Sequence, residues 1–537
     1  MQRVSAERSD APPWSGWLAA ALLLALLCVV RALVLVDATS LWGDELSTAR
    51  KSFQPSLAYL FDYLRSDTHP PLYYSLLWFW GRWLPQTAAS LRLFSWLAYL
   101  LGGLVIVRQV DRMALGLPRG RRTVALAVAV LLAFCSPFPV RFSIEAKGYS
   151  LLVLALALAL HARCRWLAPA TAASAGRRRA LIAYGLALTA AGLIHYYGLF
   201  YGVALGLADL ALWCLPALAS PRSRRLAAVV ASGLAALPSL GWIWFSRRYL
   251  LQGSEAGDWI GRPDFSLFEE ALARGLGPWP LPRMLLVGLL LVLYLGLCSR
   301  SHPGGATHWP RPWLFWLDRS VLLGGLLMVA LVVAVSFVKP LAYARYFVVV
   351  LPAAVSFLAL ACASLPAPGG GGARLLSAGV AIALGLSFWF QAFEPLDPAP
   401  PFHGSRESND FRQLVLASQD SAVRLSPRAH HFRTAERLLR RSGALPPQDS
   451  GRWGDLRELR RQVRRGAPPA SLVLTETGGP DSVQRRIDPL LQKVEAMGYT
   501  CRRELLEQPH LRLYRCSFRG SRAAAPPPRP RGSPAAA

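Results

Sequence analysis

The stretch from Trp17 to Val36, WLAAALLLALLCVVRALVLV, decides the fold class of this chain of 537 residues. Its only charged residue is Arg31. Its length is about that of an α-helix that crosses a hydrocarbon layer roughly 30 Å thick. The run is too long for a signal peptide, and no small-residue cleavage site follows it. We therefore expect an uncleaved membrane-spanning helix near the N-terminus.

Apolar runs of similar character recur along the chain. Ten more fall at about 93–107, 123–138, 148–162, 180–195, 198–215, 226–245, 283–298, 320–338, 343–363 and 374–393. With 53% hydrophobic and 17% charged residues, the composition excludes a disordered chain, a coiled coil and a small disulfide-rich protein. The sequence predicts a polytopic α-helical membrane protein with about eleven transmembrane helices.

One further apolar segment, His69 to Leu84 (HPPLYYSLLWFWGRWL), has a different composition. It is short, opens with two prolines, contains Arg82 and is rich in Trp and Tyr. That composition is typical of a helix lying at the membrane interface. We predict such an interfacial helix within a first external loop that covers residues 37–92.

The excess of basic residues indicates the orientation of the chain. There are 59 basic and 31 acidic side chains, a net charge of +28, and the loops 108–122, 162–179 and 216–225 together hold thirteen arginines. Because Lys and Arg concentrate in cytoplasmic loops, these loops and the N-terminus are expected inside. The charge therefore does not indicate nucleic acid binding. An odd number of spans places everything after about residue 394 outside the cytoplasm.

Residues 395–537 are polar and Arg-rich, with no apolar run long enough to span a membrane. Strand patterns occur at Ala470–Leu474 and Leu511–Cys516, and helix patterns at Asp410–Leu416, Thr434–Arg440 and Pro489–Met497. We predict a transmembrane domain over 1–394, a small extracytoplasmic α/β domain over 395–522, and a disordered tail over 523–537. From Pro395 onward there are 25 basic and 14 acidic residues, so this domain could face anionic head groups or cell-surface polymers.

Two of the eight cysteines, Cys501 and Cys516, flank a predicted hairpin that turns at Gln508-Pro509. Because they are symmetric about the turn, they are expected to face each other across the strands. A disulfide there would need an oxidising compartment, which agrees with the outside placement. Free, buried cysteines are the alternative.

Two motifs after the first span place acidic groups at the membrane surface. Leu41-Trp42-Gly43-Asp44-Glu45 follows the span, and Asp67-Thr68-His69-Pro70-Pro71-Leu72-Tyr73-Tyr74 lies further along the same loop. A carboxylate held close to a substrate can accept a proton from a hydroxyl. In a solvated loop the same acids have no chemical role, and the residues alone leave both interpretations open.

Two basic clusters lie at the outer ends of predicted spans, where the positive-inside tendency disfavours them. They are RFSIEAKGY at Arg141–Tyr149 and KPLAYARY at Lys339–Tyr346. An anionic ligand would explain them, since Arg and Lys make charge-assisted hydrogen bonds with phosphate. The alternative is snorkelling or local pairing, for example of Arg141 with Glu145.

The tripeptide His195-Tyr196-Tyr197 stands between two predicted spans on the same side. These residues could hydrogen-bond a sugar or a phosphate, or His195 could hold a metal with a carboxylate. Interfacial aromatic residues without such a role are the alternative. An amphipathic pattern over Phe265–Leu276 fits a surface lid and a simple connector equally well.

Taken in order, these motifs resemble those of bacterial membrane glycosyltransferases related to protein O-mannosyltransferases and the lipid A aminoarabinose transferase, which have the C-type glycosyltransferase (GT-C) fold. The resemblance rests on W-x-D-E at 42–45, HPPLYY at 69–74, RFSIEAKGY at 141–149, HYYGLF at 195–200 and KPLAYARY at 339–346. It covers roughly Trp14 to Phe393. In that family the first external loop carries the catalytic acid, the donor is a sugar on a polyprenyl phosphate, and the helix after HPP lies along the interface.

The resemblance implies an inverting transfer of a sugar from a polyprenyl phosphate donor to an acceptor hydroxyl on the outer face of the membrane. The phosphate is a good leaving group, so one carboxylate base and cations on the phosphate suffice, whereas hydrolytic glycosidases need two carboxylates. Asp44 is the expected base, with Glu45 as its orienting neighbour or the alternative base. The phosphate candidates are Arg141, Lys147 and Arg345. The expected cavity residues are Asp67, His69, Tyr149, His195, Tyr196 and Tyr343.

No cofactor is implied with certainty. Glu45, Asp67, His69 and His195 could in principle bind a divalent cation, although no H-E-x-x-H or comparable ligand spacing occurs.

A transporter or flippase of a lipid-linked sugar is the rival hypothesis, because many spans and intramembrane charges also suit an alternating-access carrier. We find no matching halves in the sequence, and the polar motifs gather at one face. A weaker alternative treats the tail as a binding module that the spans anchor. The expected partners are a polyprenyl-phosphate-linked sugar, a lipid, glycan or protein acceptor, and membrane lipids. The bias toward Arg, Ala, Gly and Pro is typical of GC-rich bacterial coding, so the expected location is the bacterial inner membrane.

Overall fold

The structure is a computed structural model of the whole chain, and it describes twelve segments of it. They are residues 15–37, 41–115, 117–168, 174–214, 221–252, 260–276, 322–364, 410–446, 452–454, 456–477, 480–506 and 511–519. The chain divides into two compact units, which are described separately below. The transmembrane unit comprises Met1–Ala38 and Thr48–Phe402, and the C-terminal unit comprises Thr39–Ser47 and His403–Ala537.

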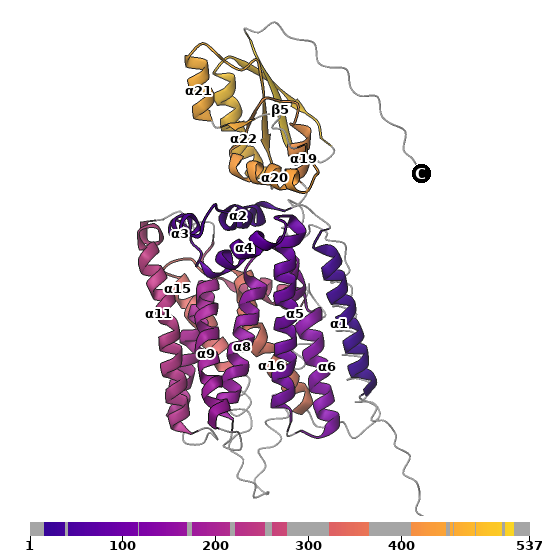
Figure 1. Ribbon diagram of the computed structural model, residues 1–537, viewed down its shortest axis with the longest axis vertical. Helices are drawn as coiled ribbons and strands as arrows, with labels where there is room; N and C mark the ends of the chain where they lie inside the picture. The colour runs from indigo at the N-terminus through magenta and orange to yellow at the C-terminus, as the bar shows by residue number, and fades with distance from the viewer. Residues whose placement is uncertain are drawn as a thin grey trace, which may run out of the picture. The chain divides into compact units, whose positions relative to one another are not determined.

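Apolar helices, most of them long, run through the transmembrane unit (Figure 1). In chain order they are α1 (Ser15–Leu35), α5 (Ala88–Met113), α6 (Arg119–Cys135), α7 (Pro137–Ser143), α8 (Tyr149–Leu167), α9 (Ser174–Ile194), α10 (Tyr196–Trp213), α11 (Arg222–Gln252), α15 (Leu322–Ser336) and the 3₁₀-helix η1 (Ala344–Val350), which continues into α16 (Leu351–Ser364). Within the described residues, six helical stretches are long and apolar enough to cross a membrane, or seven if the bent pair α6–α7 is one span. This part of the chain is therefore a polytopic helical membrane protein.

Nine of the eleven predicted spans coincide with described helices, whereas the predicted spans at 283–298 and 374–393 lie outside the described residues. The predicted first external loop contains α2 (Gly43–Ser52), α3 (Leu57–Arg65) and α4 (Leu72–Trp83). The segment after His69-Pro70-Pro71 forms α4, which has 12 residues and is therefore about 18 Å long, too short to cross the hydrocarbon layer. The amphipathic pattern at 265–276 forms α12 (Phe265–Leu276).

Small residues allow the transmembrane helices to pack closely. A side chain at Gly102 of α5 would contact the backbone of α8 at Leu154, and one at Gly324 of α15 would overlap Leu205 of α10. In a membrane, where lipid tails are as apolar as leucine, such close van der Waals contact is a main source of helix association. Leucines on the outer faces remain exposed, for example Leu26 of α1 and Leu186 of α9, as expected for surfaces in contact with lipid.

The helix after the loop 108–122 is broken at Pro137. The axes of α6 and α7 meet at 43°, because the proline ring cannot continue the hydrogen-bonded ladder of α6. The bend turns the chain into the segment 144–148 and then into α8. It therefore positions the RFSIEAKGY motif between two helix ends.

A buried group of three charges, which the sequence analysis did not single out, joins α8, α10 and α11. Asp209 accepts hydrogen bonds from Nε and Nη2 of Arg163, the first at 2.9 Å, and its Oδ1 lies 3.4 Å from Nη1 of Arg225. All three side chains are 2% exposed or less. Arg163 and Arg225 belong to the thirteen arginines counted for orientation, so at least these two have a structural role within the helix bundle.

The C-terminal unit contains a five-stranded sheet in the order β2-β1-β3-β5-β4. Its elements are α19 (Asp410–Ala417), β1 (Val423–Leu425), α20 (Ala429–Arg441), β2 (Arg452–Gly454), α21 (Leu456–Arg464), β3 (Ser471–Glu476), α22 (Pro480–Glu495), β4 (Tyr499–Glu504) and β5 (Arg512–Phe518). Strands β2, β1 and β3 are parallel, and β5 is antiparallel to both β3 and β4. One face packs against α21 and α22 through Leu425, Leu472 and Leu474, and the other packs against α19 and α20.

The predicted helix start at Pro489 was wrong. Helix α22 begins nine residues earlier at Pro480, and Pro489 lies inside it. A proline suits the first position of a helix, and Pro480 takes that position. Val483, Ile487 and Val494 are fully buried against the sheet, and this burial holds the helix together across the internal proline.

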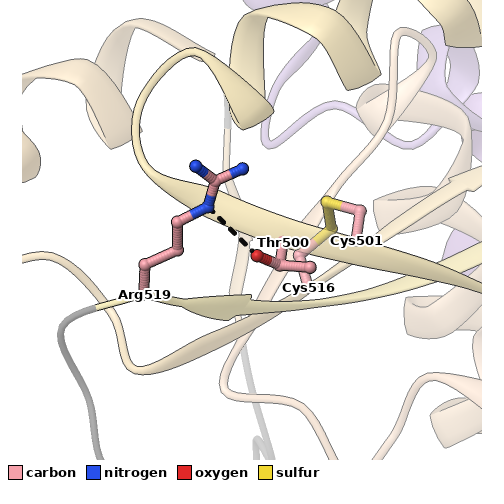
Figure 2. Close-up of a disulfide and its surroundings, with 4 residues drawn as sticks. All are labelled: Thr500, Cys501, Cys516 and Arg519. Carbon is pink, nitrogen blue, oxygen red and sulfur yellow. Dashed lines mark hydrogen bonds between the residues drawn. A yellow bond between two sulfur atoms is a disulfide. The ribbon is translucent and has the colours of Figure 1, made fainter.

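The strands β4 and β5 pair in the predicted register, with Cys501 directly opposite Cys516. The structure joins the two residues in a disulfide (Figure 2). Beside it, Nε of Arg519 donates a hydrogen bond to Oγ1 of Thr500 at 3.2 Å, from just beyond the end of β5 to the neighbouring edge strand.

Candidate active site

The acidic pair of W-x-D-E stands in the first turn of α2, where the helix dipole favours negative charge. Glu45 is fully buried, and its carboxylate accepts a hydrogen bond from the backbone N–H of Trp42 at 3.2 Å. This is the reach from the third helical residue back to the N-cap that stabilises a helix start. Glu45 therefore has a capping function, whereas the side chain of Asp44 is partly exposed.

The last turn of the same helix carries Lys51, which the sequence analysis did not select. Its Nζ lies 2.7 Å from Oδ2 of Asp67 and 5.2 Å from the centroid of the Tyr74 ring. The side chains of Lys51 and Asp67 are only 10% and 14% exposed, so this ion pair is largely shielded from water. Lys51 follows Asp44 by seven positions, which places both residues on one face of α2, about 10 Å apart along its axis.

Asp67 also orients His69. Its Oδ1 accepts hydrogen bonds from the backbone N–H of His69 at 3.0 Å and from Nδ1 of the ring at 2.7 Å. Burial raises the pKa of the Asp67 carboxyl, but the hydrogen bond and charge of His69 and the charge of Lys51 outweigh it and hold the pKa well below its usual range. Burial and the charge of Lys51 lower the pKa of His69 to about 4. At neutral pH His69 is thus uncharged, with its proton on Nδ1 and Nε2 able to accept a hydrogen bond.

His195 lies close to His69, with 6.4 Å between the ring centroids, but has the opposite tautomer. It is the N-cap of α10, and its Nδ1 accepts a hydrogen bond from the backbone N–H of Tyr197 at 3.2 Å. Burial, together with the nearby His69, Arg345 and Lys147, lowers the pKa of His195 to about 3. The neutral ring therefore carries its proton on Nε2, which can donate. The two histidines offer one acceptor and one donor side by side.

Tyrosine rings from two other parts of the chain lie around His195. Tyr149, the first residue of α8, lies 6.1 Å from the imidazole between centroids, and Tyr346 of η1 lies 4.9 Å from it. Tyr343 packs against Tyr346 at 5.5 Å. The expected cavity residues Asp67, His69, Tyr149, His195 and Tyr343 are thus brought into one cluster.

Two cations of the basic motifs belong to this cluster. Lys147 acts electrostatically on both His69 and His195, and Arg345 acts on His195. The guanidinium of Arg345 lies over the ring of Tyr343 at 4.8 Å, a cation–π contact that fixes its direction. With Lys51, three cations surround two neutral histidines and one carboxylate, an arrangement that favours an anionic ligand.

Arg141 and Tyr196 have different surroundings. Arg141 is buried and pairs with Glu145, with 2.8 Å between Nη2 and Oε1. The local pairing that the sequence left open is therefore present. At the HYY motif, the ring that packs against Tyr346 is that of Tyr197, at 5.1 Å. Its hydroxyl also donates to the carbonyl of Leu341 at 2.7 Å, which ties α10 to the segment before Arg345.

Gly198 explains the glycine of HYYGLF. A Cβ at this position would overlap the carbonyl group of Ala191 in the last turn of α9. Only glycine lets α10 start this close to the end of α9, and this close approach positions His195.

The described residues contain no group of three or more His, Cys, Asp or Glu side chains that could hold a metal ion. The divalent cation considered from the sequence stays a hypothesis.

Among known proteins, this chain is similar to solved structures in its fold. No family model matches the sequence, and no curated protein matches it. Two crystal structures of ArnT from Cupriavidus metallidurans are similar to this chain, one bound to undecaprenyl phosphate and one in the apo state. Each superposes on this chain with a TM-score of 0.56 over 93% of this chain and 98% of that chain, and the sequence identities are 15% and 16%. The S. cerevisiae protein O-mannosyltransferase Pmt1–Pmt2 complex bound to the sugar donor gives a TM-score of 0.31 at 16% identity, over 49% of this chain and 36% of that chain. Through its similarity to ArnT, the aminoarabinose transferase, the chain has the GT-C fold that its motifs indicated.

Proposed function

We propose that this protein is a glycosyltransferase that moves a sugar from a polyprenyl-phosphate-linked donor to an acceptor hydroxyl at the membrane surface. The observation that carries the proposal is the cluster of Lys51, Lys147 and Arg345 around the neutral pair His69 and His195. Three cations and an N–H donor suit a phosphate leaving group. The ArnT structure that shares the fold was solved with undecaprenyl phosphate bound, which supports the same class of donor here.

The chemistry divides between a base and the phosphate cations. Asp44 accepts the proton of the acceptor hydroxyl while the oxygen attacks the anomeric carbon. The bond from that carbon to the phosphate oxygen breaks, and the cations stabilise the departing phosphate. A single displacement of this kind inverts the anomeric configuration. Asp44 suits the role better than Glu45, because the carboxylate of Glu45 already caps α2.

The phosphate contacts that we propose differ in part from those expected from the sequence. Lys147 and Arg345 are the cations that the proposal places on the phosphate, together with Lys51. Arg141 supports them from outside the cluster, through its pair with Glu145. His195 donates Nε2–H to a phosphate oxygen, and the Nε2 of His69 accepts a hydrogen bond from a sugar hydroxyl.

The proposed setting is the bacterial inner membrane, with the N-terminus in the cytoplasm. The transmembrane domain is proposed to cover residues 1–394 and an extracytoplasmic domain residues 395–522. A test introduces Ala172→Cys in the loop 162–179, which carries five arginines. Labelling of that cysteine by an impermeant reagent added outside intact cells, beyond the level of the parent chain, would show that the orientation is inverted.

Activity is tested with the purified full chain in phosphatidylcholine liposomes, supplied with radiolabelled polyprenyl-phosphate sugars and a panel of hydroxyl acceptors. Asp44→Asn should reduce the turnover rate by about 10²- to 10⁴-fold, the range expected for loss of a general base. Asp62→Asn, which neutralises an exposed carboxylate of α3, is the matched control and should keep full activity.

Two outcomes would refute the proposal. Either the wild-type chain transfers no sugar from any polyprenyl phosphate donor, or Asp44→Asn is as active as Asp62→Asn. Movement of the intact labelled donor across the liposome membrane without transfer would instead support the rival flippase.

A further inference from the structure

The parallel strands of the C-terminal unit end at an edge where binding sites form in many open α/β sheets. Strand β1 has β2 on one side and β3 on the other, so the direction of the chain through the sheet reverses at β1. Helix α20 follows β1 and helix α22 follows β3, and these helices pack on opposite faces of the sheet. Ligands of such sheets bind outside the carboxyl ends of the strands at this reversal.

Two arginines meet at this edge on one carboxylate. Glu476, the last residue of β3, is fully buried, and its Oε1 lies 2.7 Å from Nε of Arg428 and 3.3 Å from Nε of Arg486. Both guanidinium groups also donate through Nη2 to the carbonyl of Thr477, that of Arg486 at 3.1 Å. Ser426 donates to Oε2 of Glu476 at 3.2 Å and accepts from the backbone N–H of Arg428 at 3.0 Å. We call Ser426, Arg428, Glu476, Thr477 and Arg486 the arginine edge.

The arginine edge brings two positive charges together. The two guanidinium groups share the carboxylate of Glu476 and the carbonyl of Thr477, and this proximity costs like-charge repulsion. Both arginines reach solvent, with side-chain exposures of 18% and 36%. The contacts to Glu476 and Thr477 use the Nε–Nη2 side of Arg428, and no described residue accepts a hydrogen bond from its Nη1. Its ring contact with Phe411, at 5.1 Å, keeps the guanidinium in place.

We propose that the arginine edge binds a phosphate group. Arg428 stands at the N-cap of α20 and Arg486 lies within α22, on opposite faces of the sheet, so the two guanidinium groups approach a ligand from different directions. A tetrahedral phosphate oxyanion can accept hydrogen bonds from both, and arginine binds phosphate with directional, charge-assisted hydrogen bonds. The phosphate is carried either by a soluble sugar phosphate or by a lipid head group. This site is independent of the donor site proposed for the transmembrane unit.

The test uses the full chain in phosphatidylcholine nanodiscs at constant ionic strength, with inorganic phosphate as the probe. Hydrogen–deuterium exchange followed by peptide mass spectrometry reports the site locally, because a ligand should slow exchange in peptides that start at Ser426 and in peptides that contain Arg486. Arg486→Gln is the principal variant. It leaves Arg428 paired with Glu476, so the domain should keep its fold. The matched control is Arg433→Gln, which removes one exposed charge from α20.

We expect phosphate to protect both groups of peptides in the wild-type chain and in Arg433→Gln. In Arg486→Gln the phosphate concentration for half protection should rise about tenfold or more, the loss expected for a charge-assisted hydrogen bond. Arg428→Gln should show the same loss and serves as the second variant if Arg486→Gln does not fold. Absence of protection in the wild-type chain, or equal protection in Arg486→Gln and Arg433→Gln, would overturn the proposal and leave a purely structural ion pair network.

Two further arms distinguish the sources of the phosphate. Protection by glucose 1-phosphate at concentrations similar to those for inorganic phosphate would indicate a soluble sugar phosphate. Protection that is already present when phosphatidylglycerol replaces phosphatidylcholine, before any addition, would indicate a lipid head group.

Discussion

Removal of Asp209 should destabilise the transmembrane unit more than any other single loss of charge within its buried triad. Asp209 lies between Arg163 and Arg225, and the three side chains are 2% exposed or less. In Asp209→Asn, two buried guanidinium groups would remain close together without the carboxylate that lies between them. In Arg225→Met, the pair of Arg163 and Asp209 would remain complete, with both of its hydrogen bonds.

The magnitudes follow from this geometry. Loss of one partner from a buried ion pair costs about 3–5 kcal/mol, because the charge that remains is neither hydrated nor paired. Asp209→Asn should therefore lower the free energy of unfolding by about that amount. The contact of Arg225 with Asp209, at 3.4 Å, is longer than that of Arg163, and Arg225 adds repulsion with Arg163, so Arg225→Met should change the free energy of unfolding by only about 1 kcal/mol.

The assay is equilibrium unfolding of the purified chain in mixed detergent micelles with increasing SDS, followed by circular dichroism. Asp62→Asn, on the exposed side of α3, is the control for loss of an acidic residue. Equal losses in Asp209→Asn and Arg225→Met, or a loss below about 1 kcal/mol in Asp209→Asn, would show that the triad does not hold the three helices as described.

Three further predictions concern pH, a glycine and the disulfide. The folded-state pKa values of His69 (about 4) and His195 (about 3) lie below the usual value near 6.5. The unfolded chain therefore takes up protons first as the pH falls, and the stability of the folded chain should decrease from about pH 6.5 through pH 4. Thermal scans should show this decrease in the wild-type chain and not after both histidines are changed to Gln. Gly198→Ala should lose about 1–3 kcal/mol in the SDS assay because its Cβ overlaps the end of α9, whereas Gly185→Ala, which meets nothing within 4 Å, should lose nothing. Cys501→Ser should lower the stability of the C-terminal unit by about 3 kcal/mol, the effect of opening a loop with a sequence separation of 15. A reductant should remove the difference in stability between the wild-type chain and this variant. Identical peptide maps of the wild-type chain with and without reductant would contradict the prediction.

Membrane helices could be predicted from the sequence because their signal is local. A helix in lipid must satisfy its backbone hydrogen bonds within one segment, so apolar length by itself indicates a span. Nine of the predicted runs accordingly coincide with helices. The same locality explains the register of Cys501 and Cys516, since a short hairpin fixes the pairing of its strands.

Non-local partners could not be read from the sequence. Lys51 belongs to none of the sequence motifs, and only the fold places its Nζ 2.7 Å from Oδ2 of Asp67. Likewise, the hydrogen bonds that give His69 and His195 opposite tautomers depend on the backbone around each ring. The misplaced start of α22 has a similar cause, because burial of Ile487 against the sheet outweighs the helix-breaking tendency of Pro489.

The sequence by itself determined the membrane class, the GT-C resemblance and most of the residues that gather in the candidate site, because apolar runs and short motifs are properties of neighbouring residues. Tertiary structure decided what each charge does. It pairs Arg141 with Glu145, buries Arg163 beside Asp209, and places Lys147 and Arg345 close enough to His195 to lower its pKa. The physical reason is that the energy of a charge depends on its partners and its exposure to water, and both are set by segments far apart in the chain.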